Sequence, residues 1–268
     1  AIFVLKKNNK EIIVSIVLLL LPIILYMTGS LKIKSFQSLN LIKNDYVIRA
    51  VGSNIKLERF YGNTDTASVI DELIMLSKPN SNTKTLFVWP EGIIPNTNKL
   101  ELKKFEALFK DKFNNNHLFA IGINTYENKN DKNIFYNSFS FYDNEINLID
   151  SYNKIKLVPF GEFLPFEKLF RGIGLKSLTN NYQSFSRGNK REIIDINQND
   201  FYIKILPLIC YEVIYSGTIF DNSEFDYIIN ISEDGWFGNS IGPYQHFSHS
   251  IFRAVESGKY LIRSANNG

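Results

Sequence analysis

Cysteine and histidine are scarce in this chain of 268 residues, which contains one cysteine, Cys210, and three histidines. A single cysteine excludes an internal disulfide and a cysteine-based zinc cluster, although it leaves the cellular compartment undecided. The histidines are too few and too scattered to predict a metal site. His246 and His249 are spaced to share one helix face, and we expect them to belong to a polar helix surface.

An excess of charge of one sign is also lacking, because 30 basic and 27 acidic residues leave a net charge of +3. This balance gives no support to nucleic acid as a partner, since such domains concentrate basic residues. Internal repeats and low-complexity tracts are absent from the sequence too. With 44% hydrophobic and 21% charged residues, the composition is that of a folded globular protein with an ample core.

One long hydrophobic run lies near the beginning of the chain. Residues 12–28 (IIVSIVLLLLPIILYMT) are almost continuously apolar and follow Lys6, Lys7 and Lys10. This length is at the lower limit for crossing a bilayer core, and basic residues mark the cytoplasmic end of such helices. A signal peptide is the main alternative, but no small-residue cleavage site follows, and a buried soluble helix is less favoured. We expect a transmembrane helix with a basic cytoplasmic flank in residues 1–30, and a linker in residues 31–44.

The rest of the chain alternates between strand and helix patterns. Apolar runs typical of strands occupy residues 45–50, 85–89, 118–124, 201–209, 226–231 and 260–264. Helical spacing of apolar residues is found from about residue 65 to 76, at 97–110 and at 244–257. Residues 135–142 and 145–150 predict a peripheral hairpin, and 179–199 a polar surface excursion. This alternation predicts a layered α/β domain over residues 45–268.

The only cysteine follows one of these strands. Strand 201–209 delivers Cys210 to a polar turn, as α/β proteins deliver nucleophiles, and a helix starting there would favour a thiolate. Glu91 follows strand 85–89, so we expect it at the same sheet edge, where it is a candidate general base. Lys154 and Lys156 are candidate oxyanion donors that spacing alone does not separate. Taken singly, each residue more commonly has an ordinary structural role.

Longer motifs carry a family resemblance. The order Trp89-Pro-Glu91, Tyr152-Asn-Lys154 and Ile209-Cys-Tyr-Glu212 resembles the Glu-Lys-Cys triad of the carbon-nitrogen hydrolase (nitrilase) superfamily. Within it, the chain resembles the apolipoprotein N-acyltransferases, membrane enzymes that complete bacterial lipoproteins. That narrower resemblance rests on LVPFGEFLPFE (157–167), SFSRG (184–188), DGWFGNSIGPYQH (234–246) and IRSANNG (262–268). A transmembrane helix directly before the domain fits this family and does not fit the soluble amidases.

The resemblance implies a nitrilase-like α-β-β-α sandwich preceded by one transmembrane helix. It implies Glu91 as general base, Lys154 as oxyanion donor, because it stands two residues after the tyrosine, and Cys210 as nucleophile. The neighbouring positions that match the family as substrate-binding or pocket residues are Glu162, Tyr211, Glu212, Trp236 and, more loosely as an aromatic lid residue, Tyr61. No metal or cofactor is implied.

The implied reaction is a ping-pong acyl transfer. Cys210 takes an acyl chain from a phospholipid as a thioester, and the α-amino group of a diacylglyceryl-cysteine apolipoprotein receives it. The implied location is the bacterial inner membrane, with the catalytic domain facing the periplasm. Two alternatives stay open: a membrane-tethered amidase that hydrolyses a small amide with the same triad, and a truncated, inactive domain.

The chain departs from the family at two points. Glu233 stands where the family typically has asparagine, which adds a charge near the expected site. The family's other transmembrane helices and its last strands are missing from the sequence. We therefore expect residues 45–268 to be a carbon-nitrogen hydrolase domain that is incomplete at its C-terminal end, with an open sheet edge.

Overall fold

The computed structural model describes residues 8–38, 45–62, 64–129, 132–165, 184–217, 219 and 224–268. The chain divides into two compact units, Ala1–Asn44 and Asp45–Gly268. The first contains helix α1 (Asn9–Ser38), which over residues 9–35 is long and apolar enough to cross a membrane. It continues through residues 31–38, which we predicted as linker, because that segment contains no helix-breaking proline. Lys6 and Lys7 of the predicted basic flank lie outside the described residues.

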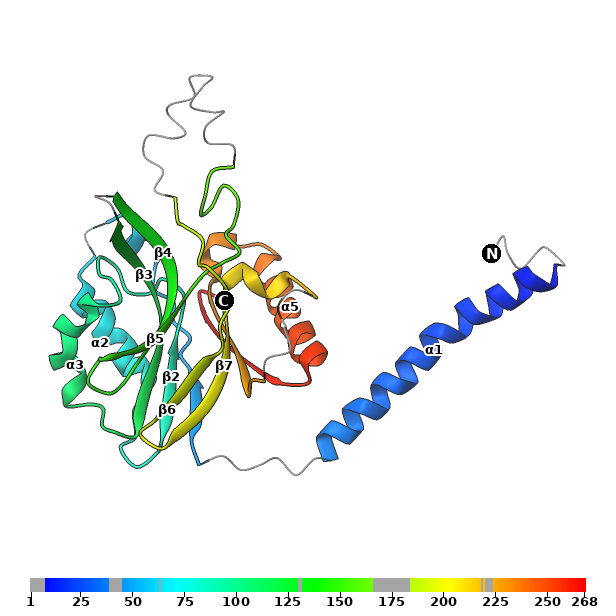
Figure 1. Cartoon of the computed structure of the whole chain (residues 1–268), viewed down its shortest axis with the longest axis horizontal. Coiled ribbons are helices and arrows are strands. Elements are labelled where there is room, and N and C mark those ends of the chain that lie inside the picture. Colours follow the sequence, from blue (N-terminus) through cyan, green and yellow to red (C-terminus); the bar gives the residue numbers. More distant parts are fainter. Residues whose placement is uncertain are drawn as a thin grey trace, which may run out of the picture. The chain divides into compact units, whose positions relative to one another are not determined.

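The second unit is built on two sheets (Figure 1). The first has the order β1 (Val47–Ala50), β2 (Thr85–Trp89), β3 (His117–Lys129), β4 (Lys132–Tyr142) and β5 (Leu148–Asn153), and the second has the order β6 (Ile194–Gln198), β7 (Phe201–Ile209), β8 (Tyr227–Glu233) and β9 (Tyr260–Asn266). Strands β1 to β3 are parallel, as are β7 to β9, whereas β3, β4 and β5 are antiparallel and β6 pairs antiparallel with β7. The predicted hairpin is β4–β5.

The sheets pack face to face between helices. Residues such as Val88, Phe141, Ile205 and Ile229 form the core between the sheets. Helix α2 (Thr66–Ser77), the 3-10 turn η3 (Glu101–Phe105) and the short helix α3 (Glu106–Lys110) cover the outer face of the first sheet (Figure 1). The 3-10 turn η5 (Cys210–Ile214) and helix α5 (Gly242–Ser257) lie on the other side of the second sheet (Figure 1). This is the α-β-β-α sandwich that the family resemblance implies, and the fold prediction is confirmed.

Two local predictions were wrong. The single helix expected at residues 97–110 is a 3-10 turn followed by a five-residue α-helix. The side chain of Asn98 accepts hydrogen bonds from the backbone of Leu100 and Glu101, which delays the start of the helical turn. Residues 194–198, predicted within a surface excursion, form strand β6, because Ile194 and Ile196 alternate into the inter-sheet core.

Candidate active site

The three residues expected to form a triad each lie just after a strand. Glu91 follows β2, Lys154 follows β5 and Cys210 follows β7, and all three are at most 9% exposed. Lys154 Nζ lies 3.3 Å from Glu91 Oε1. The charges of Glu91 and Lys154 both act on the Cys210 thiol. The structure therefore brings the three side chains into one buried cluster.

A second carboxylate completes this cluster. Lys154 Nζ donates to Glu162 Oε1 at 2.9 Å, and Val158 N donates to Glu162 Oε2 at 2.9 Å. Burial acts to lower the pKa of Lys154, but the carboxylates of Glu91 and Glu162 outweigh it and raise that pKa, so the lysine stays cationic. Lys156 is exposed, with its ammonium over the Tyr215 ring. Burial thus separates the two lysines, which spacing did not.

Asn137 is a site residue that the sequence reasoning missed. From β4 its Nδ2 atom donates to Glu91 Oε1 and to Glu162 Oε1, at 2.7 Å in each case. Asn137 and Lys154 therefore both bridge the carboxylates of Glu91 and Glu162. No local pattern distinguished Asn137, because Ser138 and Ser140 of the same strand are polar as well.

Two glycines let the backbone pack closely against the cluster. A Cβ atom on Gly122 of β3 would lie 2.5 Å from Glu91 Cα, and one on Gly188 would lie 2.2 Å from the carbonyl oxygen of Asn153. Gly188 N also donates to the carbonyl oxygen of Lys154 at 2.9 Å. The SFSRG motif therefore packs against the backbone at Asn153 and Lys154 and stabilises it.

Cys210 lies in a strained turn. Its φ of 50° is in the left-handed region, which is uncommon for a residue with a side chain. It begins the 3-10 turn η5, and not the α-helix whose N-terminus we expected to favour a thiolate. Burial and the charge of Glu91 raise the pKa of the Cys210 thiol to about 12, although Lys154 and a hydrogen bond with Ser232 act to lower it. The thiol is protonated near neutral pH and needs a base to react.

Glu212 holds backbone and side-chain donors around the buried cluster. Its side chain is fully buried, and it accepts hydrogen bonds from Tyr152 Oη, Ile155 N, Lys156 N, Arg191 Nη2 and Ile209 N. These donors come from the segment around Lys154, from Arg191 and from the residue before the cysteine. Glu212 therefore fixes the backbone around Lys154 relative to the turn at Cys210.

The aromatic residues expected beside the triad lie at the surface. The exposed Trp236 stacks on Phe60 with ring centroids 5.3 Å apart, and the exposed Tyr61 meets Trp236 edge-on at 6.3 Å. These three residues form an aromatic cluster from the turns η2 (Leu57–Phe60) and η6 (Asp234–Phe237). Tyr211 is half-buried and meets Tyr215 edge-on at 6.3 Å.

The charge that Glu233 adds is compensated within the protein. Its carboxylate forms a buried ion pair with Arg59 and accepts a hydrogen bond from Asn266 Nδ2 at 2.7 Å. The backbone N of Glu233 donates to Glu91 Oε2 at 2.9 Å. The residue therefore supports the proposed base through its backbone, while its side chain ties β8 to the turn that carries Phe60 and Tyr61.

His246 is buried, so the prediction of a polar helix surface was wrong for this residue. Its Nε2 atom lies 3.0 Å from the carbonyl oxygen of Cys210, and its Nδ1 atom lies 3.0 Å from Asp234 Oδ1. Helix α5 instead turns apolar side chains such as Phe247 and Val255 outward. Among the described residues, no group of three histidine, cysteine or acidic side chains is placed to hold a metal ion.

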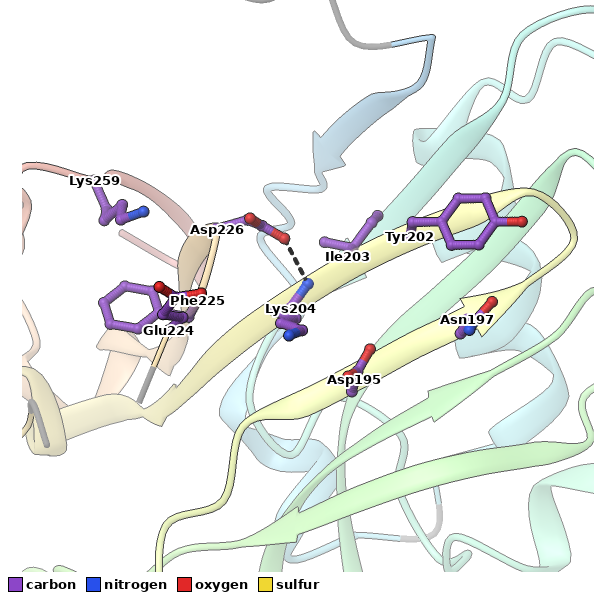
Figure 2. A pocket seen from close by; sticks show the side chains of 9 residues that line it. All are labelled: Asp195, Asn197, Tyr202, Ile203, Lys204, Glu224, Phe225, Asp226 and Lys259. Carbon is purple, nitrogen blue, oxygen red and sulfur yellow. Dashed lines mark hydrogen bonds between the residues drawn. The ribbon is translucent and has the colours of Figure 1, made fainter. Parts of the chain in front are cut away.

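Two cavities differ in their relation to the cluster. A groove of about 380 Å³ is lined by residues that include Phe60, Ile94, Asn124 and Phe135. Asn124 of β3 pairs with Asn137 of β4, so this groove lies next to the cluster. A pocket of about 530 Å³ lies on the β6–β7 hairpin, where Asp226 accepts a hydrogen bond from Lys204 N at 2.8 Å (Figure 2). None of the residues of the buried cluster lines this second pocket.

The α-β-β-α sandwich can be compared with known proteins of acyltransferase or hydrolase type. The sequence profile of the carbon-nitrogen hydrolase family matches residues 48–268, and the chain belongs to this family. It is similar in fold to a CN-hydrolase superfamily protein from Xanthomonas campestris (TM-score 0.54, 16% identity, covering 82% of this chain and 76% of that one). It is also similar in fold to a carbon-nitrogen hydrolase from Helicobacter pylori (TM-score 0.53, 16% identity, covering 83% of this chain and 73% of that one).

Curated relatives within this family are more similar to the chain in sequence. The chain is 32% identical over 231 residues to the apolipoprotein N-acyltransferase of Brucella suis, which covers 82% of this chain and 42% of the relative. It is 37% identical over 184 residues to that of Rickettsia typhi, covering 68% and 36%. The chain thus spans about two fifths of the length of the curated relatives that it matches.

Proposed function

We propose that this protein is an apolipoprotein N-acyltransferase, which moves an acyl chain from a phospholipid to the N-terminal amine of a diacylglyceryl-modified apolipoprotein. The observation that carries the proposal is the buried cluster of Glu91, Lys154 and Cys210. The similarity to relatives of that name, and a helix apolar enough to cross a membrane, direct the chemistry toward lipid substrates.

In the first half-reaction, Glu91 accepts the thiol proton as Cys210 Sγ attacks the ester carbonyl carbon of the phospholipid. Lys154 Nζ donates to the oxyanion that develops on the carbonyl oxygen. When the tetrahedral intermediate collapses, the ester C–O bond breaks and the lysophospholipid alkoxide takes the proton from Glu91. The acyl chain stays on Cys210 as a thioester.

In the second half-reaction, the amine of the apolipoprotein attacks the thioester carbonyl. Glu91 takes a proton from the amine nitrogen, the C–S bond breaks, and the proton passes to the leaving thiolate, which restores Cys210. Asn137 and Glu162 hold Glu91 and Lys154 in place through both steps. A thioester suits this sequence because it is reactive toward amines, and exclusion of water by lipid protects it from hydrolysis.

The proposal extends to the membrane setting. Residues 45–268 form the catalytic domain, and residues 1–30 anchor it in the bacterial inner membrane with the domain on the periplasmic side. The aromatic cluster of Phe60, Tyr61 and Trp236 borders the path of the acyl chain, since aromatic side chains tolerate both lipid and water.

The test is an acyl-transfer assay with two matched acceptors. The protein in phospholipid vesicles is given a synthetic diacylglyceryl-cysteine peptide with a free α-amine, or the same peptide N-acetylated. We expect the mass of one acyl chain to be added to the free amine alone. Hydrolysis of small amides without any acylation of the peptide would contradict the proposal and favour an amidase.

A further inference from the structure

The carbonyl oxygen of Cys210 is bound by two buried side chains that the reaction above does not use. His246 Nε2, from α5, lies 3.0 Å from this oxygen, and Asn230 Nδ2, from β8, donates to it at 3.3 Å. A carbonyl oxygen only accepts hydrogen bonds, so Nε2 carries a proton. The two donors converge on the one residue of the cluster that has a left-handed backbone.

The imidazole of His246 is itself held by a charged pair. Its Nδ1 atom lies 3.0 Å from Asp234 Oδ1 and 3.1 Å from Arg263 Nη2. Arg263 Nη2 donates to Asp234 Oδ2 at 2.6 Å, and Arg263 Nη1 donates to Asn230 Oδ1. Although burial acts to raise the pKa of Asp234, the hydrogen bond with His246 and the charge of Arg263 hold it at about 2. The aspartate is an anion and the ring orientation is fixed.

Asp234 is also connected to the side chain of Cys210, through Ser232. Ser232 Oγ donates to Asp234 Oδ1 at 2.7 Å, and the Ser232 hydroxyl also acts on the Cys210 thiol. Backbone and side chain of the cysteine are therefore both connected to Asp234, one through His246 and the other through Ser232. A strained backbone of this kind persists only where its surroundings determine it in several ways.

We propose that His246 is a positioning residue for the nucleophile: its Nε2–H donates to the Cys210 carbonyl and, with Asn230, holds the turn that directs Sγ toward Glu91 and Lys154. His246 meets neither the substrate nor the reacting atoms. The inference rests on the proposed function only for the identity of the substrate that the thiol attacks.

A matched pair of substitutions tests this role. His246→Gln keeps a donor near the position of Nε2, whereas His246→Asn keeps one only near the position of Nδ1. We measure, in the membrane-embedded protein, the rate of thioester formation with phospholipid and the rate at which iodoacetamide alkylates the only cysteine. We expect both rates within about threefold of the native protein for His246→Gln. For His246→Asn we expect both to fall roughly 10-fold to 100-fold, with an unchanged KM.

His117 provides the control. It is fully buried at the start of β3, and its Nε2 lies 3.0 Å from the carbonyl oxygen of Asn80. His117→Asn should lower thermal stability and leave both rates unchanged. If His246→Asn does not fold, His246→Met takes its place, because it fills the volume without a donor, and the same loss is expected.

Equal rates in His246→Gln and in His246→Asn or its replacement His246→Met, whether high or low, would overturn the positioning role. The two readouts also separate this inference from the proposed function. A native protein that forms no thioester would defeat the acyl-transfer proposal, while the alkylation rates of the variants would still decide the role of His246.

Discussion

At the scale of single residues, Glu91 has two opposite effects on Cys210. It is the proposed proton acceptor, yet after burial its negative charge is the largest influence that raises the pKa of the thiol. Glu91→Gln should therefore lower the pKa of Cys210 and still abolish acyl transfer. The positive charge of Lys154 acts in the other sense, so Lys154→Met should raise the same pKa.

The pH dependence of iodoacetamide alkylation measures both shifts, since the chain has a single cysteine. We expect the alkylation curve to move to lower pH in Glu91→Gln and to higher pH in Lys154→Met. Curves that move in the same direction would show that the two charges do not face the thiol as the structure places them.

Residues near strand ends were predictable, and residues that reach the site across the fold were not. Glu91 and Cys210 do follow apolar strands, but the expectation of a shared sheet edge was wrong, because β2 and β7 belong to different sheets and the two residues meet across the sandwich. Asn137 and His246 reach the cluster from β4 and α5, and no local pattern reports those contacts. The backbone donors that surround Glu212 could not be predicted either, because closeness to the nucleophile in the chain does not reveal which groups a carboxylate faces.

At the scale of elements, the Arg59–Glu233 pair links the turn η2 to the end of β8. Both side chains are about 1% exposed, so neither charge is solvated if its partner is lost. Glu233→Asn, which introduces the residue typical of the family, should cost about 3–5 kcal/mol of unfolding free energy because Arg59 is left as an uncompensated buried charge.

A double-mutant cycle checks this pairing. Denaturant unfolding of Arg59→Leu, Glu233→Asn and the double variant should show that the double change costs much less than the two single costs combined. Additive costs would mean that the two charges do not stabilise one another. Loosening of η2 should also reduce the turnover of lipid substrates, since that turn carries Phe60.

At the scale of the whole molecule, the alternation of strands and helices predicted an α/β layered domain, and the family resemblance specified the sandwich. The extent of α1 and the strand β6 were not predicted, because capping and packing decide where elements begin and end. The helix that is long and apolar enough to cross a membrane and the buried thiol cluster lie in separate compact units of one chain. The proposed acyl transfer from a membrane phospholipid to an apolipoprotein gives both units a role.

The central claim is that Cys210 carries the acyl chain. Intact-protein mass after incubation of the membrane-embedded protein with phospholipid, without acceptor, measures this directly for the native protein and for Cys210→Ala. We predict an added mass of one acyl chain that hydroxylamine removes and that Cys210→Ala lacks. A folded native protein without any adduct, or an adduct that persists in Cys210→Ala, would contradict the claim.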